Sequence, residues 1–376
     1  MPHRLHAINY RVFTTLLLVG LPVFLVGSYF VIASGRSNLK EAFGASLAQR
    51  AEQSAAAIDA YVYRRVVDVS LLARVPDVRN LALKAPRRPV DMAAVAELDR
   101  RFGALDLKSP VVADVLGNTA SHYFTEITRQ DPIYRELLLT DREGRLIAAS
   151  NLTTDYYQAD EDWWKRVMAD DAGEATVSDV RWDDSARTYA MEISVPVPGD
   201  DGRSAGVLKA VADIREMLAS VAGIDLGNAG EAMVVRHNGS VVFRRGTQDP
   251  HARFFGSTRL QQALGAAQPD GGLTRVSFNA TDSAGDSQMV GAATCQLSAT
   301  YPHLPWAVVV WESESRALAP VNSMFRSLML VLALTLLAVL ALAFWLSTRL
   351  AVRALESEME LVPHPHIATM AEEESV

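Results

Sequence analysis

The sequence predicts an α+β protein in which a long helix and two antiparallel β-sheet modules lie between two transmembrane helices. Three observations support this fold class. Two uncharged runs, each long enough to cross a bilayer, lie near the two ends of the 376 residues. A helical repeat of apolar residues follows the first run. The order hairpin, helix, three strands then occurs twice, which is a weak internal repeat.

The uncharged runs predict the transmembrane helices. No charged residue occurs between Arg11 and Arg36 or between Arg326 and Arg349. Both runs reach the roughly 20 residues that a helix needs to cross the hydrocarbon core. We therefore predict one transmembrane helix over residues 12–35, and a juxtamembrane segment with a second one over residues 316–348. The alternative for the first run is a cleaved signal peptide, whose apolar core is usually only about 7–15 residues.

Positive charges beside the runs predict the orientation. Arg4 and Arg11 precede the first run without any acidic residue, and Arg349 and Arg353 follow the second. Positively charged flanks stay in the cytoplasm. Residues 1–11 and 349–376 are therefore expected to be cytoplasmic, and the part between the helices is expected outside a bacterial inner membrane, in the periplasm or extracellular space.

Charge and cysteine usage exclude several classes. The net charge is −8 and no basic patch is present, which argues against nucleic acid as a partner. Cys295 is the single cysteine, so no internal disulfide can form, and its alternating apolar context predicts a buried strand residue. No nucleophile elbow, phosphate loop, HExxH motif or zinc-spaced cysteine set occurs. We predict no enzyme activity, no metal and no cofactor.

The chain between the runs divides into a helical part and two β-rich parts. Apolar residues at three- and four-residue steps predict one long helix over 37–74, which ends before Pro76. Further helices are expected over 90–106 and 111–129. The first β-rich part is predicted to contain a hairpin at 134–150, a helix at 160–169, strands at 175–182, 188–197 and 205–213, and a closing helix that ends near residue 222.

The second β-rich part repeats this order. Asn238-Gly239 is a strong hairpin-turn signal within MVVRHNGSVVFRR. A helix at 258–267 and strands at 273–279, 287–296 and 305–312 are expected to follow.

Several segments of this order resemble a known family. They are the long helix and hairpin after a membrane run, the helix DEDWWKRV, the strand MEISVPVPGDDG and the strand AGVLKAVADI. On these the chain resembles the double Cache family, the paired PAS-like sensor domains of bacterial chemoreceptors and histidine kinases. The resemblance covers about residues 37–315. It implies long and accessory helices over 36–133, a membrane-distal, ligand-binding module over 134–222, and a membrane-proximal module over 223–315.

Aromatic and acidic residues gather in the first β-rich part. Trp163, Trp164 and Trp182 lie close in sequence, with Tyr156, Tyr157 and Tyr189 around them, and residues 155–184 hold ten acidic side chains against three basic ones. Aromatic faces attract cations, by about 0.5–2 kcal/mol each, and carboxylates add charge-assisted hydrogen bonds. The alternative is core packing for the tryptophan pair and simple solvation for the acids.

The resemblance also suggests individual binding residues. Amino-acid-binding members carry Tyr, then Arg-x-Trp-Tyr, then Tyr, then Asp, in which Arg and Trp hold the ligand carboxylate while Tyr and Asp hold its amino group. The matching positions here are Tyr156, Glu161, Trp163, Trp164, Trp182 and Asp213. Glu161 stands at the arginine position and would repel a carboxylate, so an amine or ammonium ligand without a free carboxylate is predicted. The full predicted set is Tyr156, Glu161, Trp163, Trp164, Trp182, Asp184, Tyr189 and Asp213.

The sequence also bears on how such a sensor would pass its signal into the cell. The C-terminal tail has no kinase, cyclase or methyl-accepting segment, so a separate signalling protein, such as a kinase or phosphatase, is expected as the partner. A second copy of the chain is another expected partner. The alternatives are a ligand-independent membrane scaffold and a truncated chemoreceptor or histidine kinase that senses an amino acid.

Overall fold

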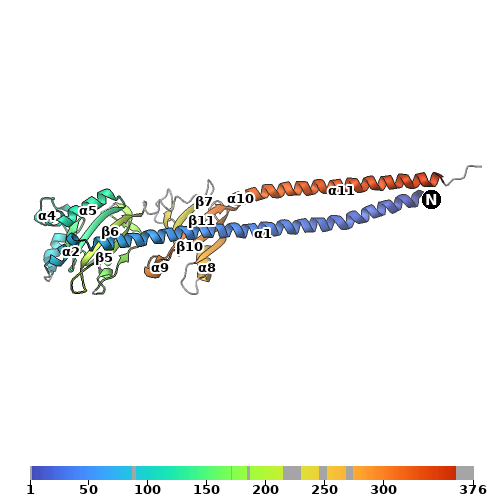
Figure 1. Ribbon diagram of the computed structural model, residues 1–376. Coiled ribbons are helices and arrows are strands. Elements are labelled where there is room, and N and C mark those ends of the chain that lie inside the picture. Colours follow the sequence, from blue (N-terminus) through green and yellow to red (C-terminus); the bar gives the residue numbers. More distant parts are fainter. Residues whose placement is uncertain are drawn as a thin grey trace, which may run out of the picture. The chain divides into compact units, whose positions relative to one another are not determined.

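The computed structural model describes residues 2–86, 90–170, 172–183, 187–214, 230–244, 252–267 and 274–360 (Figure 1). The chain forms two compact units, which we describe separately: Met1–Ala42 with Ala317–Val376, and Phe43–Arg316. The first is helical. The second, here the outer unit, contains two antiparallel sheets, so the predicted α+β class is confirmed.

The helical unit holds two candidate transmembrane helices. They belong to α1 (Pro2–Leu72) and α11 (Ala319–Glu360), with candidate spans in Leu18–Leu72 and Asn322–Leu342. In the most apolar stretch of each helix the side chains are exposed rather than packed into a core, as expected for surfaces that face lipid. Pro22 lies within α1 without ending it.

In the outer unit the helical part is more broken than the sequence predicts. The long helix ends at Leu72, and Pro76 starts α2 (Pro76–Lys84) at a position where a proline is well tolerated. The predicted helix at 90–106 is only α3 (Met92–Asp99) with a 3-10 turn, η1 (Phe102–Ala104). The predicted helix at 111–129 is divided into α4 (Pro110–Leu116) and α5 (Thr119–Gln130), because Asn118 caps α5 by accepting a hydrogen bond from the Ser121 amide.

The first sheet has the order β2-β1-β6-β5-β3, and β4 also pairs with β5. Its strands are β1 (Tyr134–Asp141), β2 (Leu146–Ala149), β3 (Thr176–Val177), β4 (Arg181–Asp183), β5 (Thr188–Pro198) and β6 (Ser204–Asp213). Helix α6 (Asp162–Val167) lies between β2 and β3 in the chain. We call this sheet with its helices the first module. The closing helix predicted after β6 lies almost wholly in residues 215–229, outside the described residues.

The second sheet repeats the first. Its order is β8-β7-β11-β10-β9, with strands β7 (Gly230–Arg236), β8 (Val241–Arg244), β9 (Arg275–Thr281), β10 (Ser287–Thr294) and β11 (Trp306–Ser313). Helices α8 (Ser257–Ala267), α9 (Leu297–Thr300) and α10 (Glu314–Ala317) complete this second module. In both sheets the last strand pairs with the first strand of the hairpin, so the predicted internal repeat is confirmed at the level of topology.

Helix α1 packs directly on the second sheet. A Cβ atom on Gly291 of β10 would lie 2.2 Å from the Ala48 backbone nitrogen, so only glycine allows this approach. Asp59 of α1 also accepts hydrogen bonds from the backbone amides of Gln296 and Leu297, at 2.8 and 3.1 Å. Cys295 is buried, as predicted, but it lies directly after β10 rather than within the strand, and burial raises the pKa of its thiol.

Candidate functional site

One face of the first sheet carries buried polar and charged side chains. Strands β1, β6 and β5 pair so that directly opposed residues form rows, and the members of a row point to the same face. Three rows on this face are Glu136–Val211–Glu192, Leu138–Lys209–Ser194 and Thr140–Val207–Pro196. We call this surface the polar face.

A buried lysine and glutamate form the centre of the polar face. Lys209 is 7% exposed and Glu192 is 2% exposed. Lys209 Nζ lies 2.8 Å from Glu192 Oε1, and Arg181 of β4 donates to Glu192 Oε2 at 2.5 Å. Burial raises the pKa of Glu192, but the charges and hydrogen bonds of Lys209 and Arg181 outweigh burial and hold it below its usual range. The Glu192 carboxylate is therefore ionised and shared between two cations.

Asp213 also has a cation partner within the protein. This fully buried carboxylate lies at the end of β6, and Arg135 donates to its Oδ2 atom from Nη2 at 2.8 Å and from Nε at 3.1 Å. The Thr188 hydroxyl donates to the same oxygen at 3.1 Å. The charge that the sequence-based prediction assigned to a ligand amino group is thus already compensated by a guanidinium.

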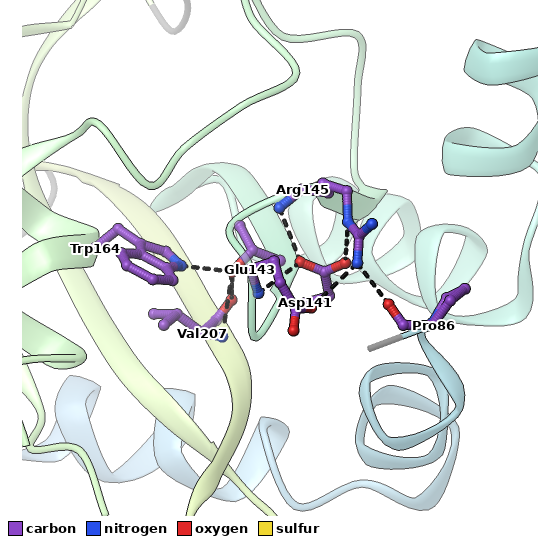
Figure 2. Close-up of polar contacts among 7 residues, drawn as sticks. Pro86, Asp141, Glu143, Arg145, Trp164 and Val207 are labelled. Carbon is purple, nitrogen blue, oxygen red and sulfur yellow. Dashed lines mark hydrogen bonds and ion pairs between the residues drawn. The ribbon is translucent and has the colours of Figure 1, made fainter. Parts of the chain in front are cut away.

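Helix α6 places the tryptophan pair on the polar face. Trp163 is buried against Val167 and Val207, and its ring centroid lies 5.0 Å from Lys209 Nζ. Trp164 donates from Nε1 to the Thr140 hydroxyl at 3.1 Å, and Figure 2 shows its indole reaching the strands beside Val207. One face of Trp163 is therefore occupied by the ammonium of the protein's own Lys209.

Two buried polar atoms on this face lack a hydrogen-bond partner among the described residues. They are Trp163 Nε1 and Ser194 Oγ. Ser194 is directly opposite Lys209 in the β5–β6 register, and the Trp163 ring contacts the Lys209 ammonium. A buried polar group without a partner costs about 1–3 kcal/mol. Two of them beside one lysine indicate a place where a bound molecule would supply the missing partners.

Two partly buried carboxylates adjoin this place. Asp155 accepts a hydrogen bond from the Thr154 hydroxyl, and Glu161 is the N-cap residue of α6 without a side-chain capping bond. Among the described residues neither forms an ion pair. Burial is the main cause that raises the pKa of both. Asp99 raises the pKa of Asp155 further and Asp155 raises that of Glu161, while the charge of Lys209 lowers the pKa of both carboxyls. Asp155, Glu161 and Glu192 together exceed Lys209 and Arg181 by one negative charge.

The structure does not bring all predicted site residues to this face. Trp182 of β4 and Tyr189 of β5 are directly opposite each other, with ring centroids 5.3 Å apart in an edge-on arrangement. Their chain neighbours Arg181 and Ala190 belong to the polar face, so these two rings point to the other side, where Trp182 is half exposed. The physical reason is strand alternation. Asp184 lies outside the described residues.

Tyr156 has a different environment from the tryptophans. Its ring packs 5.5 Å from that of Phe102, in an apolar cluster that includes Leu138 and Leu146. The backbone amides of Tyr156 and Tyr157 both donate to Asp99 Oδ1, at 2.7 and 2.8 Å, which fixes the loop before α6. Burial raises the pKa of Tyr156. Leu138 belongs to a row of the polar face, so Tyr156 lies on the same side of the sheet as the tryptophans, and the described members of the predicted constellation are divided between the two faces.

The β1–β2 turn gives the site a rigid border (Figure 2). Asp141 Oδ1 accepts the backbone amides of Glu143 and Arg145, and its Oδ2 lies 2.6 Å from Arg145 Nε. Arg145 also donates to the Pro86 carbonyl at 2.6 Å. This network satisfies its own polar groups, so we assign it to structure rather than to ligand binding.

Sequence reasoning missed several members of the polar face. They are Asp155, Arg181, Glu192, Ser194 and Lys209. A signal existed for three of them, because Glu192, Ser194 and Lys209 interrupt otherwise apolar strand runs. Charged residues inside such runs are rarely buried without a partner.

The second module has an open groove of about 320 Å³, which does not correspond in position to the polar face of the first module. It is lined at the start of α8 and along β9 by Phe255, Gly256, Thr258, Arg259, Asn279, Ala280, Thr281 and Ser287. Its polar lining side chains are all exposed. The groove lies at an edge strand of the sheet, without the buried charges of the polar face.

Two similar antiparallel sheets joined to a long helix, one of them with a polar face, define the chain as a paired sensor module. The family model described as the Cache domain, in its double form (dCache), matches residues 35–321, and the chain belongs to this family. Cache domains are extracytoplasmic, ligand-binding signalling domains, in keeping with the two candidate transmembrane helices. No relative was found by sequence among proteins of curated function.

Several solved structures have similar folds. The ligand-binding domain of the Campylobacter jejuni chemoreceptor Tlp3 in complex with L-norvaline has 11% identity and a TM-score of 0.49, over 74% of this chain and 94% of that chain. The corresponding domain of Pseudomonas aeruginosa PctB in complex with L-Arg has 15% identity and a TM-score of 0.45, over 74% and 97%. That of Pseudomonas fluorescens CtaA in complex with L-serine has 13% and 0.45, over 73% and 99%.

Proposed function

We propose that this protein is a membrane-bound extracytoplasmic sensor that binds a small cationic amine on the polar face of the first module. The observation that carries the proposal is the pair Asp155 and Glu161, which form no ion pair among the described residues and feel the charge of Lys209. Lys209 also lies at the ring of Trp163, whose Nε1 has no hydrogen-bond partner among these residues. A partly buried carboxylate has lost part of its hydration, and a bound cation compensates for that loss with charge-assisted hydrogen bonds. An ammonium group between Asp155 and Glu161 would be such a cation.

The same geometry supports a hydrogen-bond acceptor on the ligand. Trp163 Nε1 can only donate, and the Ser194 hydroxyl can donate as well. Lys209 is beside both, but Glu192 already compensates its charge at 2.8 Å and would repel a second carboxylate. An uncharged oxygen, such as an amide or ester carbonyl, therefore fits better than a carboxylate. We expect a cationic amine that carries such a carbonyl.

A free α-amino acid is the second candidate. It is favoured by Lys209 and Trp163 Nε1 together, because an ammonium and an indole N–H can both donate to one carboxylate. The two candidates differ in net charge. A neutral zwitterion leaves the excess negative charge of the cluster in place, whereas an amino acid amide removes it.

A three-compound titration separates the candidates. Full-length protein in detergent would be titrated calorimetrically with an α-amino acid, its amide, and the amine of the same side chain without a carbonyl, across several side chains. We expect the amide to bind at least about tenfold more tightly than the other two, which is about 1.4 kcal/mol. Preference for the free amino acid would overturn the amine proposal in favour of the second candidate.

A ligand-independent scaffold predicts a different result. Any compound that binds only the native state must raise the unfolding midpoint. A library of amines, amides and amino acids without a single midpoint shift would support the scaffold. The separate signalling partner, a kinase or phosphatase, stays a prediction, and co-purification from native membranes with and without a binding amine is its test.

A further inference from the structure

One short segment of the first module contacts both the polar face and the second module. It comprises residues 177–181, which connect β3 to β4, and we call it the bridging segment. Its residues are all described, and three of them contact the second module while the other two contact the polar face.

Three residues of the bridging segment contact the second module. Asp179 Oδ2 lies 2.6 Å from Arg236 Nε, and Asp179 Oδ1 accepts a hydrogen bond from Trp306 Nε1 at 3.0 Å. Arg236 also donates to the Val180 carbonyl at 3.3 Å, and the His303 ring nitrogen Nε2 is hydrogen-bonded to the Val177 carbonyl. Arg236 and Trp306 are the last residue of β7 and the first residue of β11, and they are directly paired.

The other two residues of the bridging segment contact Glu192 on the polar face. Ser178 exchanges two hydrogen bonds with the Glu192 backbone, from its amide to the carbonyl at 2.8 Å and from the Glu192 amide to its hydroxyl at 2.9 Å. Arg181 donates to the Glu192 carboxylate at 2.5 Å. Glu192 in turn holds Lys209, the lysine beside the two unpartnered polar atoms.

We infer that the bridging segment couples occupancy of the polar face to β11 of the second module, with Asp179 as the coupling residue. The inference rests on the proposed function. A cationic ligand among Asp155, Glu161 and Lys209 changes the electrostatic potential at the Glu192 carboxylate. The strength of the ion pair between Glu192 and Arg181 therefore changes as well. Two residues away, Asp179 is bonded to the start of β11, the strand that leads to α10. A ligand shifts an equilibrium only through such differential contacts.

Asp179 makes this coupling specific because it uses both carboxylate oxygens. Each oxygen accepts from a different residue of the second module, and Trp306 is fully buried. Movement of the bridging segment must therefore either move the start of β11 or break two charge-assisted hydrogen bonds. The exposed Asp170 forms no side-chain hydrogen bond or ion pair with any residue that the structure describes, and it provides a matched control.

A double-mutant cycle read by hydrogen exchange tests this without any ligand. The full chain in detergent would be compared as wild type, Glu192→Gln, Asp179→Ala and the double variant, by mass spectrometry of peptides over residues 303–316. We expect Glu192→Gln to speed exchange there on the order of tenfold in the wild-type background and to add nothing in the Asp179→Ala background. Asp170→Asn should leave the effect of Glu192→Gln intact.

Two outcomes would overturn the inference. One is an absent effect of Glu192→Gln on residues 303–316, and the other is an equal effect with and without Asp179. If Asp179→Ala does not fold, Arg236→Met replaces it, because it removes the ion pair from the other side and keeps the Trp306 bond. The failure of ligand binding in the titrations above would leave this cycle unaffected, so the two proposals fail separately.

Discussion

The two sheets have one topology but opposite chemistry on corresponding faces. Counted from the hairpin turn, the row Leu138–Lys209–Ser194 of the first sheet corresponds to Met233–Val309–Ala292 of the second. In the adjacent row of each sheet, Glu192 of the first sheet corresponds to Val290 of the second. A lysine, a serine and a glutamate thus stand where the second module has valine, alanine and valine.

The covering elements differ in the same way. In the second module Phe254, Leu260 and Leu264 pack on this face and, with Trp311 of β11, complete an apolar core. In the first module α6 covers the face with Trp163 but leaves Trp163 Nε1 and Ser194 Oγ without partners among the described residues. The fold itself therefore needs no polar group there. The first module keeps these polar groups although they lower its stability, so we assign ligand binding to the first module. We assign a purely stabilising role to the apolar core of the second.

The largest expected effect comes from placing the lysine in the wrong module. Val309→Lys puts an ammonium into the apolar core of the second module, where Glu231, the one carboxylate in the adjacent rows of described residues, is exposed and already paired with Arg244. A buried charge without a partner costs several kcal/mol, and we expect a loss of at least about 4 kcal/mol in unfolding free energy. Urea unfolding measures it. Asn279→Lys on the exposed edge strand should stay within about 0.5 kcal/mol of wild type, and a similar loss there would contradict the explanation.

The second expected effect comes from removing Glu192 alone or together with Ser194 and Lys209 of the polar face. Glu192→Val alone leaves Lys209 buried without its partner and should cost about 3 kcal/mol. The swap variant Glu192→Val, Ser194→Ala, Lys209→Val gives the first module the residues of the second. Because whole buried ion pairs are often replaced by apolar residues without loss, its unfolding free energy should stay within about 1 kcal/mol of wild type. A swap variant less stable than Glu192→Val would refute the assigned roles.

The third prediction concerns the carboxylates that have no ion pair. Asp155→Asn and Glu161→Gln should each weaken binding of a cationic amine by about tenfold, because each loses one charge-assisted hydrogen bond. The exposed Asp170→Asn is the matched control and should change affinity less than about twofold. Equal losses in all three variants would indicate long-range attraction rather than a site at Asp155 and Glu161.

The affinity for a cationic ligand should decrease as pH falls. Burial raises the pKa of Asp155 and of Glu161, so their contribution to stability is present below the unfolded pKa and is lost as pH rises through the folded pKa. The ionised forms bind ammonium, so affinity for a quaternary ammonium compound should fall between about pH 7 and about pH 4.5. Calorimetry at both values measures this, and Asp155→Asn with Glu161→Gln should remove the change. Glu192 has its pKa lowered, so its contribution to stability is present above the unfolded pKa and is lost as pH falls through the lower folded pKa.

The smallest effect is expected at Ser194. Ser194→Ala removes a buried hydroxyl without a partner among the described residues, so the free protein should become more stable by up to about 1 kcal/mol. Amines with a carbonyl should then bind a few-fold more weakly, while amines without one should bind as before. Thermal unfolding and calorimetry together check both signs. A destabilised Ser194→Ala variant would show that the hydroxyl already has a partner.

Much of the fold could be predicted from the sequence because periodicity and turn chemistry are local. Gly144 and Gly239 adopt positive φ values, 86° and 81°, in the two hairpin turns that the sequence indicated. The break before α5 was missed because it depends on Asn118, which also donates to the Ile147 carbonyl, a contact distant in sequence.

The candidate site was only partly predictable. Trp163 and Trp164 lie on the polar face, but strand alternation turns Trp182 and Tyr189 to the other side, which a count of nearby aromatic residues cannot detect. Asp213 was assigned to a ligand because its partner, Arg135, lies 78 positions earlier in the chain. Partners of buried charges come from register, and register is not local in sequence.

The most direct test of the assignment is one calorimetric comparison. Wild type and the swap variant, both as full-length protein with matching circular dichroism, would be titrated with the amino acid amide that binds wild type most tightly. We predict saturable binding to wild type and no detectable heat from the swap variant. Equal affinity in the two proteins would place the ligand elsewhere, with the groove at α8 and β9 as the next surface to examine.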